Sequence, residues 1–386
     1  MPIALLALIL AAPIAASPPM PPQQPQITIT GHRLSDYRIA LDQCLTAKCP
    51  PLQDIIASVR YAEALFKSGD YAGSRAVLSK SVARNQGAGA IEPAALSQLY
   101  VAQATVAAHF GEQRDVEHAT FASARVTHDF MAPGTPDRLW ADLRVADYRL
   151  ANERFGGDEA FAKVAADARA AGHPQIAAAA DLHRAWGLHA HRRDAEADRI
   201  LAALAATPGD AARPYRIAAR VLTSRIARAR GDKGATDAMI AALQGDPDVG
   251  APTLVYSPPY PQPTDPVIYN PFVIATDVTT QSGDVRGLQW VDIGFGIKDD
   301  GTVETPEVLR GSRTADWAGP LVKMIAGRRY TPSAASDDTG HYRVERYTLT
   351  ADFATPVGSL IRRRVSVPRY EQLDLTDGNA PPHAPS

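Results

Sequence analysis

Only two cysteines occur among the 386 residues, Cys44 and Cys49, and their spacing allows three kinds of chemistry. In an oxidising compartment a pair this close forms a local disulfide, and closing so short a loop stabilises the fold by about 2 kcal/mol in the chain-entropy model. A redox-active pair more often has two intervening residues, and a zinc site needs further ligands at matching spacing. We therefore predict a structural disulfide.

Three clustered histidines, His183, His189 and His191, are candidate metal ligands. On a helix, residues two apart point to different sides, so His189 and His191 cannot share one ion. We expect these histidines to be exposed on a helix, with no metal and no cofactor. Gly-x-Ser-x-Gly, His-Glu-x-x-His and Gly-x-x-x-x-Gly-Lys motifs are also missing from the sequence. The expectation is a protein that is not an enzyme; the alternative is an enzyme whose site is assembled from distant residues.

The charge balance bears on the class of partner. The chain has 40 basic and 42 acidic residues, a formal net charge of −2. A nucleic-acid-binding protein would need a basic face that releases counterions, so no nucleic-acid partner is expected. The length allows two or three domains, each with its own core.

The first residues predict export. The apolar run from Ile3 to Ala16 is interrupted by Pro13 and is shorter than the roughly 20 residues of a membrane span. Small residues at Ala15-Ala16-Ser17 offer a cleavage site. Residues 1–17 are therefore predicted to be a signal peptide, which places the protein in the periplasm without a stable transmembrane span. The alternative is an uncleaved inner-membrane anchor. Residues 18–35 form a Pro/Gln-rich leader.

Residues 36–245 have the periodicity of paired helices. Val59, Ala62 and Phe66 share one helical face, and a turn follows them. Turns recur at intervals close to 40 residues, at Gly69-Asp70, Gly111-Glu112, Gly156-Gly157, Arg193-Asp194 and Gly231-Asp232. Alanine, the best helix former, accounts for 29 of the 91 residues from 155 to 245. The pattern predicts an all-α solenoid of helical hairpins.

The stretch Ala64–Arg75, with Leu65-Phe66, Gly69 and Tyr71, resembles the junction between the two helices of a tetratricopeptide repeat. The resemblance implies a concave face that binds peptides or partner proteins. The alternative is a scaffold without a ligand of its own.

Residues 246–284 are predicted to be a Pro-rich linker, with seven prolines between 252 and 271 and a short strand at Thr253–Tyr256. Beyond it the apolar period changes to two. Residues 285–370 are predicted to form a small β-β-α-β domain, with strands at 288–298, 302–309 and 341–353 and a helix from Ser312. Residues 371–386 are predicted to be a disordered tail.

This β-β-α-β order resembles the C-terminal domain of the TonB family of energy transducers. The similarity lies in an Asp-Gly turn, Asp300-Gly301, and in an aromatic-x-Pro sequence, Tyr330 to Pro332. In that family a free sheet edge accepts an extended peptide of an outer-membrane receptor as an added strand. The resemblance implies that the third strand is this edge, with Val344, Arg346 and Thr348 on one of its faces. The alternative is a terminal domain whose edge pairs with its own chain or with a second copy.

The sequence therefore predicts a multidomain, exported, non-enzymatic interaction module of the cell envelope. It would bind a protein or peptide partner, such as a receptor segment, through the helical groove, by strand addition, or by both. A homodimer through the sheet edge is a further expectation. The alternative is a membrane-anchored TonB-type energy transducer.

Overall fold

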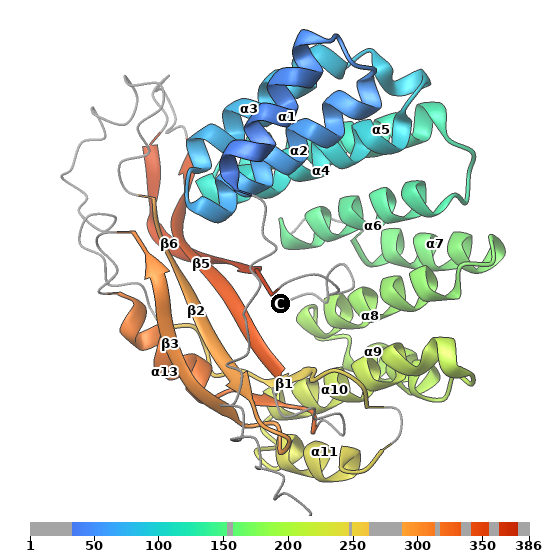
Figure 1. Cartoon of the computed structure of the whole chain (residues 1–386). Coiled ribbons are helices and arrows are strands. Elements are labelled where there is room, and N and C mark those ends of the chain that lie inside the picture. Colours follow the sequence, from blue (N-terminus) through green and yellow to red (C-terminus); the bar gives the residue numbers. More distant parts are fainter. Residues whose placement is uncertain are drawn as a thin grey trace, which may run out of the picture. The chain divides into compact units, whose positions relative to one another are not determined.

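The computed structural model describes residues 33–152, 157–246, 249–261, 288–312, 317–332, 341–354 and 363–376. The signal peptide predicted for residues 1–17, and the leader as far as residue 32, lie outside these residues. From Leu34 onward the chain belongs to one compact unit, in which a series of helices is followed by an antiparallel sheet (Figure 1). The prediction of a helical region followed by a small α+β region is confirmed at this level.

The helices form one leading helix and five successive hairpins. Their bounds are α1 (Leu34–Thr46), α2 (Pro51–Ser68), α3 (Tyr71–Asn85), α4 (Pro93–Phe110), α5 (Gln113–Phe130), α6 (Pro136–Ala151), α7 (Gly157–Ala170), α8 (Pro174–Ala190), α9 (Asp194–Ala205), α10 (Arg213–Ala229) and α11 (Ala235–Leu243), with 3-10 turns η1 (Ala88–Ala90) and η2 (Asp210–Ala212).

Local sequence explains where the hairpins begin and turn. Pro51, Pro93, Pro136 and Pro174 each occupy the first position of the first helix of a hairpin, where the missing N–H costs nothing. Gly69 and Gly111 end α2 and α4 in the left-handed conformation, with φ of 92° and 73°. The turns predicted at Gly69-Asp70, Gly111-Glu112 and Gly231-Asp232 lie between paired helices, and Arg193-Asp194 lies where α9 begins; Gly156 lies outside the described residues.

Each hairpin buries its apolar face against its neighbours. The first core joins α2, α3, α4 and α5 and includes Phe66, Tyr71 and Leu99. A second core joins α6, α7 and α8, and a third joins α8, α9 and α10. The second and third cores share α8, and α5 packs against α6 between the first and second, so the helical part is one continuous stack, as in an α-solenoid.

The strands form two sheets. Their bounds are β1 (Leu254–Tyr256), β2 (Gln289–Ile297), β3 (Val303–Gly311), β4 (Arg329–Tyr330), β5 (His341–Ala354) and β6 (Arg363–Asp374), with helix α13 (Ala318–Ala326) between β3 and β4. The larger sheet has the order β3-β2-β5-β6 and is antiparallel throughout, whereas β1 pairs with β4.

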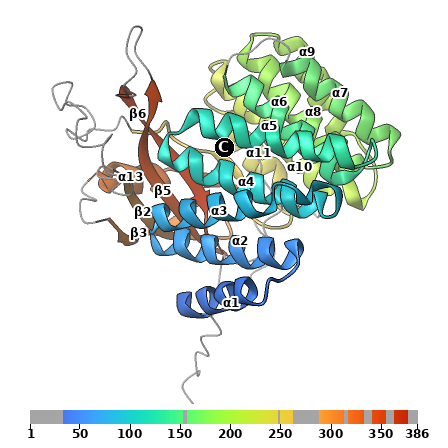
Figure 2. The ribbon, with the colours of Figure 1, turned by 90° about the horizontal axis from the view of Figure 1, so that it is seen from above.

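The larger sheet lies between α13 and the helical stack (Figure 2). Ile293, Phe295 and Tyr347 pack on α13 in a core of their own. On the opposite face, Trp290 and Leu373 pack against the core of α2–α5. Both faces of the sheet are therefore covered over part of their length.

The smaller sheet meets the stack at α10, through the segment expected to be a linker. Strand β1 lies within it, which confirms the short strand predicted at Thr253–Tyr256. Arg225 of α10 donates hydrogen bonds to the carbonyl oxygens of Leu254 and Val255. On its other side β1 pairs with β4, and Thr331 N donates to Thr253 O at 2.8 Å. This part of the predicted linker therefore joins the two regions rigidly.

Two predicted boundaries are wrong. Helix α1 begins at Leu34, within the expected leader. Residues 371–374, expected in a disordered tail, belong to β6. Residues 262–287 and 377–386 lie outside the described residues.

Candidate functional site

Strand β5, the predicted docking edge, lies inside the sheet. It pairs with β2 from His341 to Leu349 and with β6 from Glu345 to Ala354. From Glu345 to Leu349 its main chain is therefore paired on both sides, and Val344 is engaged by β2 and by Leu375 N, so the expectation that Val344, Arg346 and Thr348 line an open edge is wrong. The position at which the TonB-like domain was expected to receive a peptide holds this chain's own strand.

Arg346 joins the sheet to the first hairpin. Its guanidinium is fully buried and contacts Asp292 of β2 at 2.6 and 2.8 Å. It also donates to the carbonyl oxygens of Phe66 and Lys67 at the end of α2, and it lies 4.0 Å from the ring centre of Trp290. The last carbonyls of a helix lack partners within the helix, so Arg346 caps α2 from the sheet.

Thr348 forms the second contact between the sheet and the stack. Its hydroxyl lies 2.9 Å from the hydroxyl of Tyr71 and 2.8 Å from Nδ1 of His109. Burial, together with the positive charges of Arg346 and Arg369, lowers the pKa of His109 to about 3. His109 is therefore neutral at physiological pH and acts here as a hydrogen-bonding group of a buried junction.

The opposite face of β5 carries another buried ion pair. Arg328 lies 2.7 Å from Glu345, and it also donates to the hydroxyl of Tyr347 at 2.7 Å. Burial and the neighbouring Glu345 raise the pKa of Tyr347 well above its usual value. Arg346 and Glu345 of β5 are thus engaged in buried contacts on opposite faces of the sheet, which hold helices and strands together.

The four residues that carry the family resemblance lie close together. Asp300 and Gly301 form the β2–β3 turn, and Tyr330 N donates to the carbonyl oxygen of Gly301 at 2.8 Å. Hydrogen bonds from Thr302 hold the pKa of Asp300 below its usual value. Asp300 and Pro332 line a cleft of about 350 Å³ beside the end of α11.

Strands β3 and β6 are the outermost strands of the larger sheet. The pairing of β3 with β2 is interrupted twice by register shifts, and Thr305 has a φ of 37°. Pro306 has no main-chain N–H, so this strand has one hydrogen-bond donor fewer. Two charged residues, Glu304 and Glu307, lie close to Pro306 in the strand. Bulges, proline and charges are the features with which proteins prevent strand addition, so β3 is poorly suited to it.

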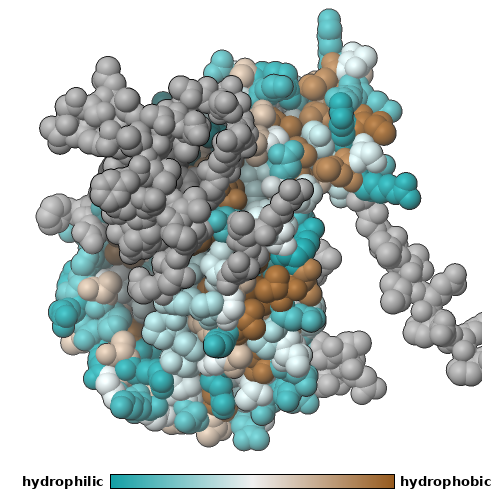
Figure 3. All heavy atoms as spheres, turned by 90° about the vertical axis from the view of Figure 1, so that its left-hand side faces the viewer, coloured by the Kyte–Doolittle hydropathy of each residue, from teal (hydrophilic) through white to brown (hydrophobic). Residues whose placement is uncertain are grey.

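The N-terminal helical pair α1–α2 exposes apolar side chains. Of the 12 large apolar residues that are exposed in the described part of the chain, five lie on these two helices. They are Leu34, Ile39, Leu45, Leu52 and Ile56. Figure 3 shows apolar groups gathered at the upper right, over this end of the stack, and others near β3, where Val308 and Leu309 are exposed.

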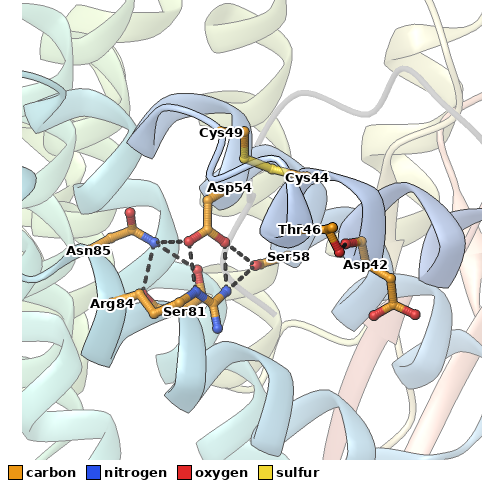
Figure 4. Close-up of a disulfide and its surroundings, with 9 residues drawn as sticks. All are labelled: Asp42, Cys44, Thr46, Cys49, Asp54, Ser58, Ser81, Arg84 and Asn85. Atoms are coloured by element: carbon orange, nitrogen blue, oxygen red, sulfur yellow. Dashed lines mark hydrogen bonds and ion pairs between the residues drawn. A yellow bond between two sulfur atoms is a disulfide. The ribbon is translucent and has the colours of Figure 1, made fainter.

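The predicted disulfide lies at the base of this pair (Figure 4). Cys44 near the end of α1 is bonded to Cys49, just before α2, with a Cα–Cα distance of 5.1 Å. Helix α1 has one fully buried side chain, Leu41, and a partly buried Tyr37, so burial of this helix contributes only about 2–3 kcal/mol. The disulfide therefore contributes about as much to holding α1 as burial does.

A polar network beside the disulfide fixes α2 to α3 (Figure 4). The carboxylate of Asp54 receives hydrogen bonds from Arg84 at 2.6 and 2.8 Å, from Asn85 at 2.8 Å and from Ser58 at 2.9 Å. Burial opposes ionisation, but these three donors outweigh it and lower the pKa of Asp54.

The three histidines do not share a site. His183 is buried and contacts Asp147, so the expectation that it is exposed is wrong; His189 contacts Asp194 at 2.7 Å, and His191 is exposed. Nowhere in the described residues do three His, Cys, Asp or Glu side chains lie close enough to hold a metal ion. In the same residues no helix is both long and apolar enough to cross a membrane.

Sequence reasoning did not find β6 or the N-terminal apolar face. Alternation from Val365 to Leu373 was a signal for β6, but Pro368 concealed it, since proline is tolerated on an outer strand. For the apolar face, the signal was the pair Leu52 and Ile56, four residues apart near the start of α2.

In comparisons with known proteins, no family model matches the chain, and neither a curated protein nor a solved structure matches it.

Proposed function

We propose that the protein is an exported, non-enzymatic interaction module of the cell envelope, and that its docking surface is the outer face of α1–α2. The observation that carries this proposal is the gathering of five of the 12 exposed large apolar residues on these two helices. Exposed apolar side chains gathered at one end of a stack are typical of a protein-binding site. The apolar N-terminal run of the sequence supports export.

The two ends of the stack differ, and the difference indicates what the surface binds. In the described part of the chain, α10 and α11 carry none of the exposed large apolar residues, and β1 covers the apolar side chains of α11. Terminal repeats of a solenoid normally present a polar outer face. The apolar face of α1–α2 is therefore suited to a further helix.

The occupant we propose is an amphipathic helix of another protein, which would continue the stack. Leu52 and Ile56 are four residues apart on α2, the spacing with which one helix packs against another. A negatively charged lipid surface fits less well, because α1 carries Asp36 and Asp42 against a single cation, Arg38. Strand addition at β5 is not part of the proposal.

The test is site-specific photo-crosslinking in intact cells, with the crosslinker at Leu52 of the full-length protein. The expected product joins Leu52 to a peptide of another protein whose apolar residues recur every three or four positions. A matched pair of variants follows: Ile56→Asp, where the side chain is 41% exposed, and Ile91→Asp, where it is 72% exposed and lies outside the surface. Crosslinking should be lost in Ile56→Asp and retained in Ile91→Asp.

Three outcomes would contradict the proposal. Crosslinks to a second copy of this chain would make the surface a self-association site, and crosslinks to lipid would make it a membrane contact. Equal crosslinking in the two variants would show that the apolar face is not what the partner recognises.

A further inference from the structure

Helices α1 and α2 are held in place by different means. Helix α2 buries Asp54, Ile55, Ser58, Ala62, Leu65 and Phe66 and is joined to α3 by the Asp54 network. Helix α1 has one fully buried side chain, Leu41, and two partly buried ones, Tyr37 and Cys44. A 13-residue helix is marginally stable by itself in water, so α1 depends on what fastens it to α2.

The Cys44–Cys49 disulfide closes the connection between these helices. Lys48, within the six-residue loop, has a φ of 51°, a left-handed conformation that a lysine adopts only at a cost in free energy. The loop must keep this conformation for α1 to fold back along α2. Hydrogen bonds from Lys48 N to Leu45 O at 3.2 Å and from Cys49 N to Cys44 O at 3.0 Å close this turn, and the disulfide adds a covalent link across it; both cysteines are partly accessible at the surface.

We infer that this disulfide is a redox switch for α1: a dithiol reductant releases α1 from α2 and leaves the helices from α2 onward folded. One thiolate of the reductant attacks a disulfide sulfur, the other cysteine leaves as a thiolate, and the second thiol of the reductant resolves the mixed disulfide. The protein gains two electrons and two protons, and the reductant is oxidised to its own disulfide.

The consequence for binding rests on the proposed function. Leu34, Ile39 and Leu45, three of the five residues of the docking surface, belong to α1. Release of α1 therefore dismantles the surface, and Leu52 and Ile56 remain alone on α2. Reduction switches partner binding off while the rest of the fold persists.

Hydrogen exchange of the full-length protein tests the switch without reference to any partner. The measurements are made on the oxidised protein, after dithiothreitol, and after reoxidation. Amides of residues 34–46 should exchange on the order of tenfold faster or more after reduction, residues 51–68 should be unchanged, and reoxidation should restore protection. Trypsin cleavage after Arg38, an exposed side chain on α1, should accelerate in parallel.

Two variants sharpen the test. Cys44→Ser/Cys49→Ser should behave like the reduced protein under all conditions. Asp54→Asn keeps the disulfide but weakens the contact of α2 with α3, so protection should fall in residues 51–85 whether or not the reductant is present. If residues 34–46 keep their protection after reduction, or if reduction unfolds α2 as well, the inference is wrong.

The Leu52 crosslink separates failure of the switch from failure of the proposed function. If reduction speeds the hydrogen exchange of α1 but leaves the Leu52 crosslink unchanged, the switch is supported and the docking surface is contradicted. An intact crosslink with unchanged exchange would support the docking surface and overturn the switch.

Discussion

Arg346 and Asp292 form an ion pair from which water is excluded: their side chains are 0% and 1% exposed, and Nε lies 2.6 Å from Oδ1. The same guanidinium reaches the carbonyl oxygens that end α2, about 280 positions earlier in the sequence. Removal of one member of a buried pair leaves an uncompensated charge. This contact therefore controls how the sheet attaches to the helices.

Replacing Arg346 should be far more harmful than replacing the second arginine on the same carboxylate. Arg346→Met leaves Asp292 buried without its main partner and should lower the free energy of unfolding by about 3–5 kcal/mol. Arg310 also contacts Asp292, at 2.7 Å, but its side chain is 52% exposed. Arg310→Met should therefore cost no more than about 1 kcal/mol. Urea unfolding followed by circular dichroism measures the free energy of unfolding of both variants. Equal losses in the two variants would contradict the assignment of Arg346 as the main partner of Asp292.

Gly111 should tolerate alanine less well than Gly172, although both have positive φ, 73° and 78°. A Cβ at Gly111 would collide with the carbonyl oxygen of Ala351 on β5, whereas a Cβ at Gly172 meets nothing within 4 Å. Both substitutions should cost about 1–2 kcal/mol for the left-handed backbone. Gly111→Ala should cost about 1–3 kcal/mol more, from overpacking at the junction. Equal midpoints of thermal unfolding for the two variants would show that the α4–α5 turn is not in tight contact with β5.

His109 should make the fold less stable as pH falls. Its native pKa of about 3 lies below the unfolded value of about 6.5, so between these values the unfolded chain binds a proton that the native protein does not. Above pH 6.5 neither the native nor the unfolded state carries this proton, so the free energy of unfolding does not change with the titration of His109. Below pH 6.5 the free energy of unfolding should decrease by up to about 1.4 kcal/mol per pH unit. His109→Asn should remove this slope, which urea titrations between pH 4 and 8 measure. His191→Asn, at an exposed position, is the control, and a slope that survives in His109→Asn would contradict the prediction.

Asp54 should contribute to acid sensitivity at lower pH. Its native pKa is lowered, so its contribution is complete above the unfolded value of about 4 and is lost as pH falls through the native value. Asp54→Asn should reduce stability near pH 7 and flatten the loss below pH 4, as measured by acid unfolding followed by tryptophan fluorescence. Asp42→Asn replaces an exposed carboxylate and should change stability near pH 7 by less than about 1 kcal/mol.

Local patterns were sufficient for most of the secondary structure. Val59, Ala62 and Phe66 gave the first hairpin because helical periodicity and the Gly69 turn lie within a few residues of each other. The β2–β3 hairpin followed in the same way from alternation around Asp300-Gly301. A pattern of this kind needs no knowledge of the rest of the chain.

The role of β5 could not be read from such patterns. Alternation placed Arg346 and Thr348 on one face, and both side chains do lie on the helical side of the sheet. What covers them comes from Phe66, Tyr71 and His109, more than 230 residues earlier. The number of strands was also underestimated. Strand β6 contains Pro368, and a proline within an alternating stretch argues against a central strand.

The strands contact the helical stack near both of its ends, the larger sheet through Arg346 at α2 and the smaller sheet through β1 at α10, and Tyr330 N of β4 donates to Gly301 O of the β2–β3 turn. In an open solenoid, small rotations between neighbouring repeats add up and change its curvature. Here the two ends are joined through one brace of hydrogen-bonded strands, so such rotations cannot accumulate. The strands therefore limit changes in the spacing between the first and last hairpins, and the stack should resist stretching more than an open solenoid does.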